Sequence, residues 1–140
     1  MKITVIIPSY NQGEFLEACL QSILCQKDGE TEILVFDGGS HDDSMHILKK
    51  YQDCITHWES EPDRGQTHAI NKGLERMSGD AWCYLNSDDL LEEGALSRVA
   101  EVFEEPTVNW VVGQTLVFDK DSTHGIREPR LPETKRDYLP

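Results

Sequence analysis

Along the first 118 residues, the spacing of apolar residues changes repeatedly between strand-like and helix-like. The run 3–8 is rich in β-branched residues and ends at a proline, which predicts a short buried strand. The same alternation predicts further strands over 32–37, 55–59, 81–85 and 110–118, and helices over 14–26, 44–52, 67–77 and 96–103. Parallel strands joined by helices form right-handed crossovers. The sequence therefore predicts an α/β fold, a mainly parallel twisted sheet with helices on both faces.

The stretch 119–140 differs in composition from the rest of the chain. It holds three of the six prolines, five acidic and five basic residues, and its apolar residues show no regular spacing. A chain of 140 residues has room for one core of ordinary size. We therefore expect one domain over 1–118 and an irregular tail over 119–140, which is either a surface-bound extension or a connection to a further segment.

The chain is strongly acidic. Lys and Arg total 13 against 26 Asp and Glu, which gives a formal net charge of −13. This charge argues against a nucleic acid or an anionic membrane as partner, and an anionic ligand would need a local compensating charge. The longest apolar run near the start, 5–7, is too short for a transmembrane segment or a secretion signal. We expect a cytoplasmic protein, either free or peripheral to the inner face of a membrane.

The tryptophans and cysteines are predicted to be structural. Trp58, Trp82 and Trp110 fall in predicted strands, where large aromatic side chains usually join the core. The four cysteines show no metal-binding spacing, and three of them lie in apolar segments. We expect reduced thiols, in agreement with a reducing compartment.

Polar residues follow directly after the predicted strands, in the segments 8–11, 37–40, 61–65 and 86–89. In an open parallel sheet, ligands bind beyond the carboxyl ends of the strands. Asp37 and Asp88 stand at two such ends, and neighbouring carboxylates repel unless a cation lies between them. The sequence thus predicts Mg²⁺ or Mn²⁺ among the carboxylates at this edge of the sheet, with Asp37 and Asp88 facing a common cleft and phosphates of a substrate completing the coordination.

Some of the polar residues after the strands have an equally good structural interpretation. Asp42, Asp43 and Asp89 stand next to helix starts and are more typical of helix caps and turns. The glycines at 38–39 and Gly65 could let the backbone approach a ligand, or could serve turns with positive φ.

Two further side chains leave alternatives open. Arg64 could neutralise a phosphate or pair with its neighbour Asp63, and Tyr10 could stack on a base or cover the end of the sheet. The five histidines share no spacing typical of a metal site.

Five segments, in their order and spacing, resemble the family 2 glycosyltransferases. They are 6–11 (IIPSYN), 35–42 (VFDGGSHD), 61–66 (EPDRGQ), 69–73 (AINKG) and 84–89 (YLNSDD). Each segment alone is a weak signal, but the five together over residues 3–89 are specific. The family consists of inverting enzymes with the Rossmann-like GT-A fold that use a nucleotide-diphosphate sugar, and the resemblance covers their nucleotide-binding half.

The resemblance implies roles for particular residues. The loop 8–11 is similar to the loop that holds the nucleotide, and Asp37 matches the carboxylate that accepts a hydrogen bond from the base, most often uracil. Asn86, Ser87 and Asp88 occupy the place of the D-x-D motif, with Asp88 matching the metal ligand. The residues that the resemblance assigns to the nucleotide are Pro8, Ser9, Tyr10, Asn11, Asp37, Arg64, Asn86, Ser87 and Asp88.

Three departures from the family pattern matter. Asn86 replaces the first carboxylate of D-x-D, which leaves Asp88 as the main direct metal ligand, and Ile70 stands where many relatives have arginine. The general base of the family comes from the later, acceptor-binding half, and 119–140 would be only the start of that half. No residue is assigned as the base; Asp119, Asp121 and Glu128 would qualify only in a shortened variant.

The resemblance therefore implies a metal-dependent glycosyltransferase that moves a sugar, with inversion, from a UDP-sugar or similar donor to a hydroxyl of a carbohydrate or lipid-linked acceptor. We expect this chain by itself to bind the nucleotide weakly and to turn over little or not at all. The alternative is a non-catalytic nucleotide-sugar-binding or interaction module. A receiver-like or phosphatase-like Mg²⁺ domain fits less well, because its phosphoacceptor motif is missing.

Overall fold

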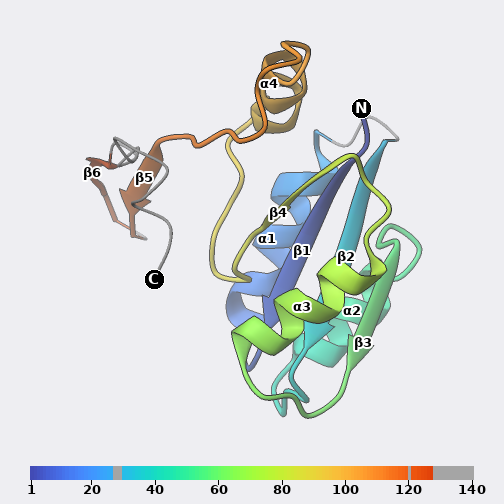
Figure 1. Cartoon of the computed structure of the whole chain (residues 1–140). Helices are drawn as coiled ribbons and strands as arrows, with labels where there is room; N and C mark the ends of the chain where they lie inside the picture. The colour runs from blue at the N-terminus through green and yellow to red at the C-terminus, as the bar shows by residue number, and fades with distance from the viewer. Residues whose placement is uncertain (27–29, 120, 128–140) are drawn as a thin grey trace. The chain divides into compact units, whose positions relative to one another are not determined.

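The computed structural model describes residues 1–26, 30–119 and 121–127. Strands and helices alternate through most of the chain, and Figure 1 labels them. The strands are β1 (Ile3–Ser9), β2 (Thr31–Asp37), β3 (His57–Ser60), β4 (Ala81–Tyr84), β5 (Thr115–Phe118) and β6 (Thr123–Arg127), and the helices are α1 (Gly13–Leu24), α2 (Ser44–Tyr51), α3 (Gln66–Arg76) and α4 (Ala95–Val102).

The main sheet has the strand order β3-β2-β1-β4, and all its pairs are parallel. All seven residues of β1 and all seven of β2 are buried, because each of these strands is paired on both sides and covered on both faces. The register places Ser9 opposite Asp37 and Asp37 opposite Ser60, so three strands end at one level. The predicted α/β fold with a mainly parallel sheet is confirmed.

The side chains of β1 alternate between two cores, one on each face of the sheet. Val5 and Ile7 pack with residues of α1, α2 and α4, whereas Ile6 packs with Leu34, Phe36 and Ala69 under α3. Figure 1 shows α3 on one face of the sheet and α1 and α2 on the other. Helices on both faces explain why the central strands are apolar at every position rather than at every second one.

Helix α3 lies unusually close to the sheet at Gly73. A Cβ added at Gly73 would stand 2.5 Å from Cγ2 of Ile6 and 2.8 Å from two other Ile6 carbons, and Ile6 is fully buried. We expect Gly73→Ala to lower the free energy of unfolding by about 1–3 kcal/mol through overpacking, although alanine favours a helix over glycine by about 1 kcal/mol. Urea denaturation measures this change.

The matched control for Gly73→Ala is Glu75→Ala in the same helix, because Glu75 is exposed. Its free energy of unfolding should change by no more than about 0.5 kcal/mol. A Gly73→Ala variant as stable as the original chain would show that the helix can move away from Ile6 without cost.

Strands β5 and β6 form a separate antiparallel pair, and this corrects two predictions. The predicted strand 110–118 is a strand only from Thr115 onward, and it does not join the parallel sheet. The tail predicted as irregular contributes β6. At the turn between them, Oδ1 of Asp119 accepts the backbone N–H groups of Asp121 and Ser122, so a local turn decides the pairing. The rest of the tail, including Glu128, lies outside the described residues.

Contacts between residues divide the chain into two compact units, Met1–Glu101 and Val102–Pro140. This division falls before the boundary expected from the sequence, at residue 118. The strand β5 pairs with β6 inside the second unit rather than with the main sheet, which explains the earlier division. All residues that the sequence assigns to the nucleotide belong to the first unit.

The tryptophans are less buried than expected. Trp58 packs against the core, but Trp82 is 46% and Trp110 58% exposed. Trp82 lies on β4, at the edge of the sheet, and α3 packs over β1 and β2 instead. The prediction of three core tryptophans is therefore right for Trp58 and wrong for the other two.

The cysteines and the helices add two findings about the described residues. None of the four cysteines, all of which are described, forms a disulfide; Cys19 is buried, Cys83 packs against the core, and Cys25 and Cys54 are exposed.

Among the helices of the described ranges, none combines the length and the apolar character that crossing a membrane would require.

Candidate functional site

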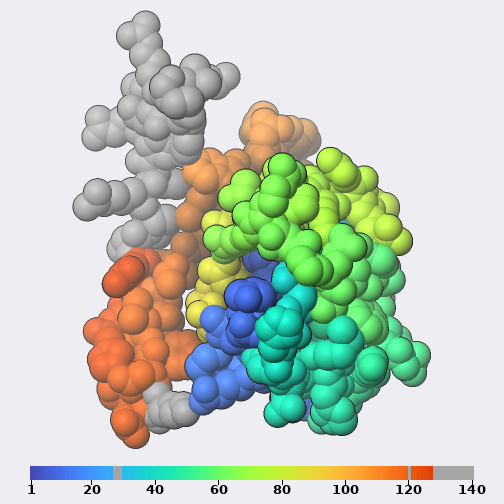
Figure 2. All heavy atoms as spheres, turned by 90° about the horizontal axis from the view of Figure 1, so that it is seen from below, coloured from blue at the N-terminus to red at the C-terminus, as the bar shows by residue number. Residues whose placement is uncertain are grey.

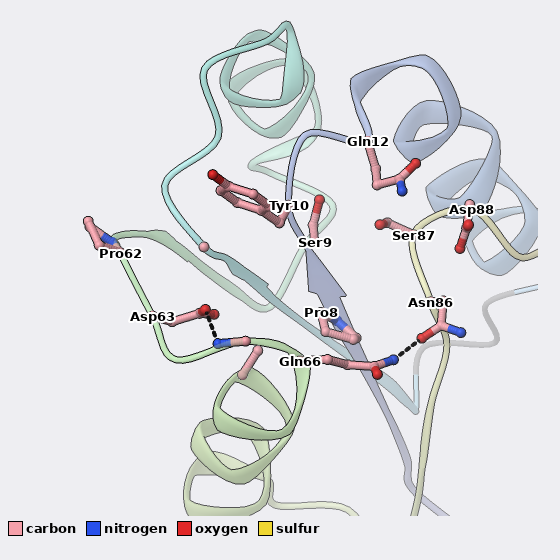
Figure 3. A pocket seen from close by; sticks show the side chains of 13 residues that line it. Pro8, Ser9, Tyr10, Gln12, Pro62, Asp63, Gln66, Asn86, Ser87 and Asp88 are labelled. Atoms are coloured by element: carbon pink, nitrogen blue, oxygen red, sulfur yellow. Dashed lines mark hydrogen bonds between the residues drawn. The ribbon is translucent and has the colours of Figure 1, made fainter.

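The carboxyl ends of the four parallel strands surround a cavity of about 500 Å³. Figure 2 looks onto this end of the molecule, where the blue, cyan, green and yellow segments meet. A cavity of this size is typical of a site for a small molecule or cofactor. The lining residues are Pro8, Ser9, Tyr10, Gln12, Gly38, Pro62, Asp63, Gly65, Gln66, Ala69, Asn86, Ser87 and Asp88 (Figure 3).

Six of the nine residues that the sequence assigns to the nucleotide line this cavity. They are Pro8, Ser9, Tyr10, Asn86, Ser87 and Asp88. The first three come from the end of β1 and the last three from the loop after β4, because these two strands are neighbours in the sheet. The lining does not include the other three, Asn11, Asp37 and Arg64, and the cause differs for each.

Asp37 is engaged by its own surroundings. Its side chain is buried, and its Oδ2 accepts the N–H groups of Gly39 at 3.1 Å and Ser40 at 2.8 Å and the hydroxyl of Ser60 at 2.6 Å. Its Oδ1 accepts the hydroxyl of Ser40. Four donors hold this carboxylate inside the loop after β2. Asp88 lines the cavity and Asp37 does not, so the expectation that the two carboxylates face a common cleft is wrong; hydrogen bonds within the protein engage Asp37 instead.

Asn11 joins the loops after β1 and β2. Its backbone adopts a positive φ of 52°, its N–H donates to Oγ of Ser40 at 2.7 Å, and its Oδ1 accepts the N–H of His41 at 2.9 Å. Asparagine tolerates this left-handed conformation better than most residues. Asn11 thus supports the shape of the cavity wall without belonging to the lining.

Arg64 is exposed and does not line the cavity, and no ion pair joins it to Asp63, although both residues are described. Asp63 instead accepts the N–H of Gly65 through Oδ1 at 2.7 Å. Because the cavity lining of the described residues contains neither lysine nor arginine, the side chains there offer no positive charge to an anionic ligand.

Asn86 connects helix α3 with the loop after β4. Its Oδ1 accepts a hydrogen bond from the side-chain amide of Gln66, and its Nδ2 donates to Oδ2 of Asp89 at 3.1 Å. An aspartate at position 86 would place a second carboxylate against Asp89. This contact explains physically why an amide suits the first position of the D-x-D-like segment.

Asp88 is exposed at the cavity, and its charge acts on its neighbours. Burial raises the pKa of the Cys19 thiol to about 12, and the nearby charges of Asp89 and Asp88 add to this rise. Within the described ranges, no group of three or more His, Cys, Asp or Glu residues could hold a metal ion. A single carboxylate fits a divalent ion that keeps several waters and takes its other ligands from substrate phosphates.

Ser9 lines the cavity and carries a buried hydroxyl without a hydrogen-bond partner among the described residues. Its side chain is only 5% exposed. A buried hydroxyl without a partner is costly, by about 1–3 kcal/mol. A ligand with a polar group at this position would remove that cost.

Of the aspartates expected to cap helices, Asp42 makes such hydrogen bonds and Asp43 does not. Asp42 accepts the N–H of Gly13 at 2.8 Å and that of Ser44 at 3.0 Å, so it joins the starts of α1 and α2, which confirms its structural interpretation. Asp43 stands at the N-cap of α2 but makes no side-chain capping bond.

The sequence assigned no role to several lining residues. Gln12, Pro62, Asp63, Gln66 and Ala69 are of this kind. The signal that could have found Asp63 is its place in the polar segment after β3, next to a glycine with a positive φ of 98°. For Gln12 and Ala69, the local sequence offers no such signal, because they meet the cavity only through the packing of α1 and α3.

Comparisons with known proteins agree with this geometry. The model of the family described as "Glycosyl transferase family 2" matches residues 4–139. An uncharacterized glycosyltransferase of Nostoc is 32% identical over 149 residues, which cover 95% of this chain and 44% of the relative. This chain thus spans less than half the length of that relative.

The solved structures similar to this chain include two glycosyltransferases in complex with a donor. Staphylococcus aureus TarS in complex with UDP-GlcNAc aligns with a TM-score of 0.68 at 26% identity, over 75% of this chain and 32% of TarS. The mannosyltransferase PcManGT from Pyrobaculum calidifontis, in complex with GDP-Man and Mn²⁺, aligns with a TM-score of 0.67 at 25% identity, over 76% of this chain and 33% of that one. Because the family model matches nearly the whole sequence and the parallel sheet carries its cavity at the strand ends, the chain belongs to glycosyl transferase family 2 and has the GT-A fold.

Proposed function

We propose that this chain is the nucleotide-sugar-binding part of a glycosyltransferase that transfers a sugar from a nucleoside-diphosphate sugar to an acceptor hydroxyl with inversion. The observation that carries the proposal is the cavity at the carboxyl ends of the strands, with Tyr10, Ser9 and Asp88 in its lining. The complexes of the two similar structures with UDP-GlcNAc and with GDP-Man and Mn²⁺ support a donor of this class. A non-catalytic module is not favoured, because the curated relatives are glycosyltransferases.

In this proposal, each lining residue has a physical task. The exposed ring of Tyr10 offers a face on which a base can stack, and the hydroxyl of Ser9 can bond a polar group of the nucleotide. Asp88 would hold Mg²⁺ or Mn²⁺ together with the diphosphate. Bound there, the ion would offset the negative charge that develops on the leaving diphosphate. Asp88 fits this task because the described lining supplies no cationic side chain.

The acceptor side of the reaction extends the proposal beyond the cavity. The sequence-based boundary at residue 118 would separate β5 from β6, so we propose that the nucleotide sugar binds within the unit Met1–Glu101 and that the acceptor-binding half begins after it. Inversion requires a base that removes the proton of the acceptor hydroxyl while the hydroxyl attacks the sugar from the face opposite the diphosphate. The acceptor is a carbohydrate or a lipid-linked carbohydrate, and the reaction takes place in the cytoplasm or at the inner face of a membrane.

Isothermal titration calorimetry on the 140-residue chain tests this function. UDP or GDP should bind with a dissociation constant below about 1 mM when Mn²⁺ is present, and more weakly when EDTA removes the metal. The physical reason is that the cavity lacks a side chain that would neutralise the diphosphate. Inorganic diphosphate with Mn²⁺ serves as the control, because it lacks the base that Tyr10 would contact. If no nucleoside diphosphate binds below this concentration with metal, the proposal fails.

A further inference from the structure

The side chain of Gln66 connects helix α3 with the segment that follows β4. Gln66 is the first residue of α3 and lines the cavity, and the sequence assigned no role to it. Its Nε2 donates a hydrogen bond to Oδ1 of Asn86, and Figure 3 shows the two side chains reaching toward one another beside Pro8. Among the described residues, no other hydrogen bond joins α3 to the segment 86–92. Gln66 is therefore the residue through which α3 acts on this wall of the cavity.

The chemistry of the three side chains fixes the direction of each hydrogen bond. An ionised carboxylate can only accept, so Asn86 turns its Nδ2 toward Oδ2 of Asp89, at 3.1 Å. The Oδ1 of Asn86 then faces Gln66, which has to donate through Nε2. The backbone N–H of Asp89 also donates to the carbonyl oxygen of Asn86 at 3.0 Å. A side chain at position 66 that cannot donate would break this arrangement.

Helix packing fixes the place of Gln66. Residues three and four apart lie on one face of a helix, so Gln66, Ala69 and Gly73 lie along the same face of α3. Ala69 is buried, and Gly73 lies against Ile6 of β1. These close contacts leave α3 little freedom to slide along the sheet. The amide of Gln66 is therefore a fixed support for Asn86.

Asp88, by contrast, depends on the backbone that carries it. Its side chain is exposed and accepts no hydrogen bond from the described residues. On the α1 side of the segment, the carbonyl oxygen of Asn86 accepts the S–H of Cys19 at 3.6 Å. On the α3 side, the side chain of Asn86 accepts the hydrogen bond from Gln66. Asn86 is thus held between two helices, two residues before Asp88.

We infer that Gln66 is a positioning residue for the metal ion of the proposed function. Through Asn86 it holds the segment 86–89 so that the carboxylate of Asp88 reaches a divalent ion and the diphosphate together. For this effect Gln66 touches neither the ion nor the nucleotide. The inference rests on the proposed function, and it makes the metal-dependent part of nucleotide binding depend on a side chain of α3.

The test is Gln66→Met, which keeps the length of the side chain and removes the donor. Calorimetry on the 140-residue chain measures the dissociation constant of UDP, or of GDP if that nucleotide binds more tightly, in Mn²⁺ and in EDTA. In Mn²⁺ the variant should bind about 3- to 10-fold more weakly than the original chain, the loss expected for one hydrogen bond between uncharged groups. In EDTA the two chains should bind equally. A residue that only shapes the lining would weaken binding equally in both buffers, which would overturn the inference.

A double-mutant cycle tests whether Gln66 acts through Asn86. Asn86→Leu keeps the shape of the side chain and removes the hydrogen bonds to Gln66 and Asp89. In that background, Gln66→Met should have no further effect on the affinity in Mn²⁺, since the contact is already lost. Equal effects of Gln66→Met in the two backgrounds would contradict the inference.

The matched control is Thr67→Val in the same turn of α3. Thr67 is exposed and does not line the cavity, and valine has the same shape as threonine. The affinities of this variant in Mn²⁺ and in EDTA should equal those of the original chain. The control separates the contact with Asn86 from a general effect of changing the first turn of the helix.

The outcomes are distinct. If the original chain binds UDP or GDP more tightly in Mn²⁺ and Gln66→Met keeps the full response to Mn²⁺, the inference is wrong and the proposed function stands. An original chain that binds equally in both buffers also contradicts the inference, because there is then no metal ion to position. If neither nucleotide binds, the proposed function itself fails. Circular dichroism and a thermal melt show whether the variant is folded. Should Gln66→Met be unfolded, Gln66→Ala replaces it with the same expected loss, because alanine favours a helix.

Discussion

Asp88→Asn is expected to reduce the Mn²⁺-dependent affinity for a nucleoside diphosphate by about 100-fold, while the fold stays intact. Among the described residues, the lining of the cavity contains no cationic side chain, so in the proposed function the diphosphate would depend on a metal ion held by Asp88 on the β4 side. Because Asp88 is exposed, its replacement should not disturb the core. Calorimetry with UDP or GDP, in Mn²⁺ and in EDTA, measures the effect.

Glu93→Gln is the matched control for Asp88→Asn. Glu93 is exposed, follows the same strand and is not part of the lining, so the variant has the same change in net charge. Its affinity should equal that of the original chain in both buffers. An Asp88→Asn variant that responds to Mn²⁺ like the original chain would assign the metal to another ligand.

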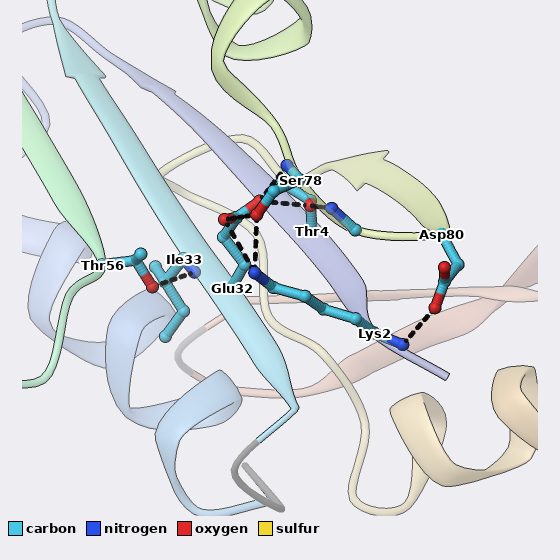
Figure 4. A network of polar contacts seen from close by, with 8 residues as sticks. Lys2, Thr4, Glu32, Ile33, Thr56, Ser78 and Asp80 are labelled. Atoms are coloured by element: carbon cyan, nitrogen blue, oxygen red, sulfur yellow. Dashed lines mark hydrogen bonds and ion pairs between the residues drawn. The ribbon is translucent and has the colours of Figure 1, made fainter.

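Glu32→Gln is expected to destabilise the fold strongly, from the end of the sheet opposite the cavity. Glu32 is 5% exposed and accepts hydrogen bonds from Oγ1 of Thr4 at 2.6 Å, from N and Oγ of Ser78 at 2.8 and 2.5 Å, and from Nζ of Lys2 at 3.2 Å (Figure 4). A glutamine would turn an NH₂ group toward these donors. We expect a loss of about 3 kcal/mol in the free energy of unfolding at pH 7.

The same carboxylate predicts how stability changes with pH. Burial by itself would raise the pKa of Glu32, but the hydrogen bonds from Ser78 and Thr4, with that of Lys2, lower the pKa to about 2 from 4.5. A group with a lowered pKa stabilises the folded state above its unfolded value and loses this contribution as the pH falls through its folded value. The contribution, about 3 kcal/mol, should therefore be complete above pH 4.5 and disappear toward pH 2.

Urea denaturation at pH 7 and at pH 2 to 3 measures this effect as the difference between the original chain and Glu32→Gln, because other carboxylates titrate equally in both. The difference should shrink as the pH falls. Glu75→Gln, an exposed carboxylate outside the network, should show little difference at either pH. A difference that stays constant with pH would contradict the assignment of the network to an ionised Glu32.

The local sequence was sufficient for the main sheet and its helices. The apolar runs at β1 and β2 and the helical spacing in α1 and α3 predicted these elements with ends that differ by one or two residues, because the period of apolar residues reflects how each element meets the core. It was not sufficient for β5 and β6. The two strands pair with each other through the turn at Asp119. The spacing of apolar residues predicts neither this turn nor which strand pairs with β5.

For the site, the sequence alone determined which segments meet. In a parallel sheet the residues after the strands gather at one edge, so the sequence already places Ser9, Tyr10 and Asp88 together, and all three line the cavity. Only the tertiary structure decided which carboxylates line this cavity. Asp37 is held by donors from its own loop and by Ser60 of β3, which is 23 residues away in the chain, and it lies outside the lining, whereas Asp63 and Asp88 line the cavity. The direction of a polar side chain depends on which hydrogen-bond donors surround it, and only the folded chain brings these donors together. The order of the strands and of the polar segments, by contrast, follows from the spacing of residues along the sequence.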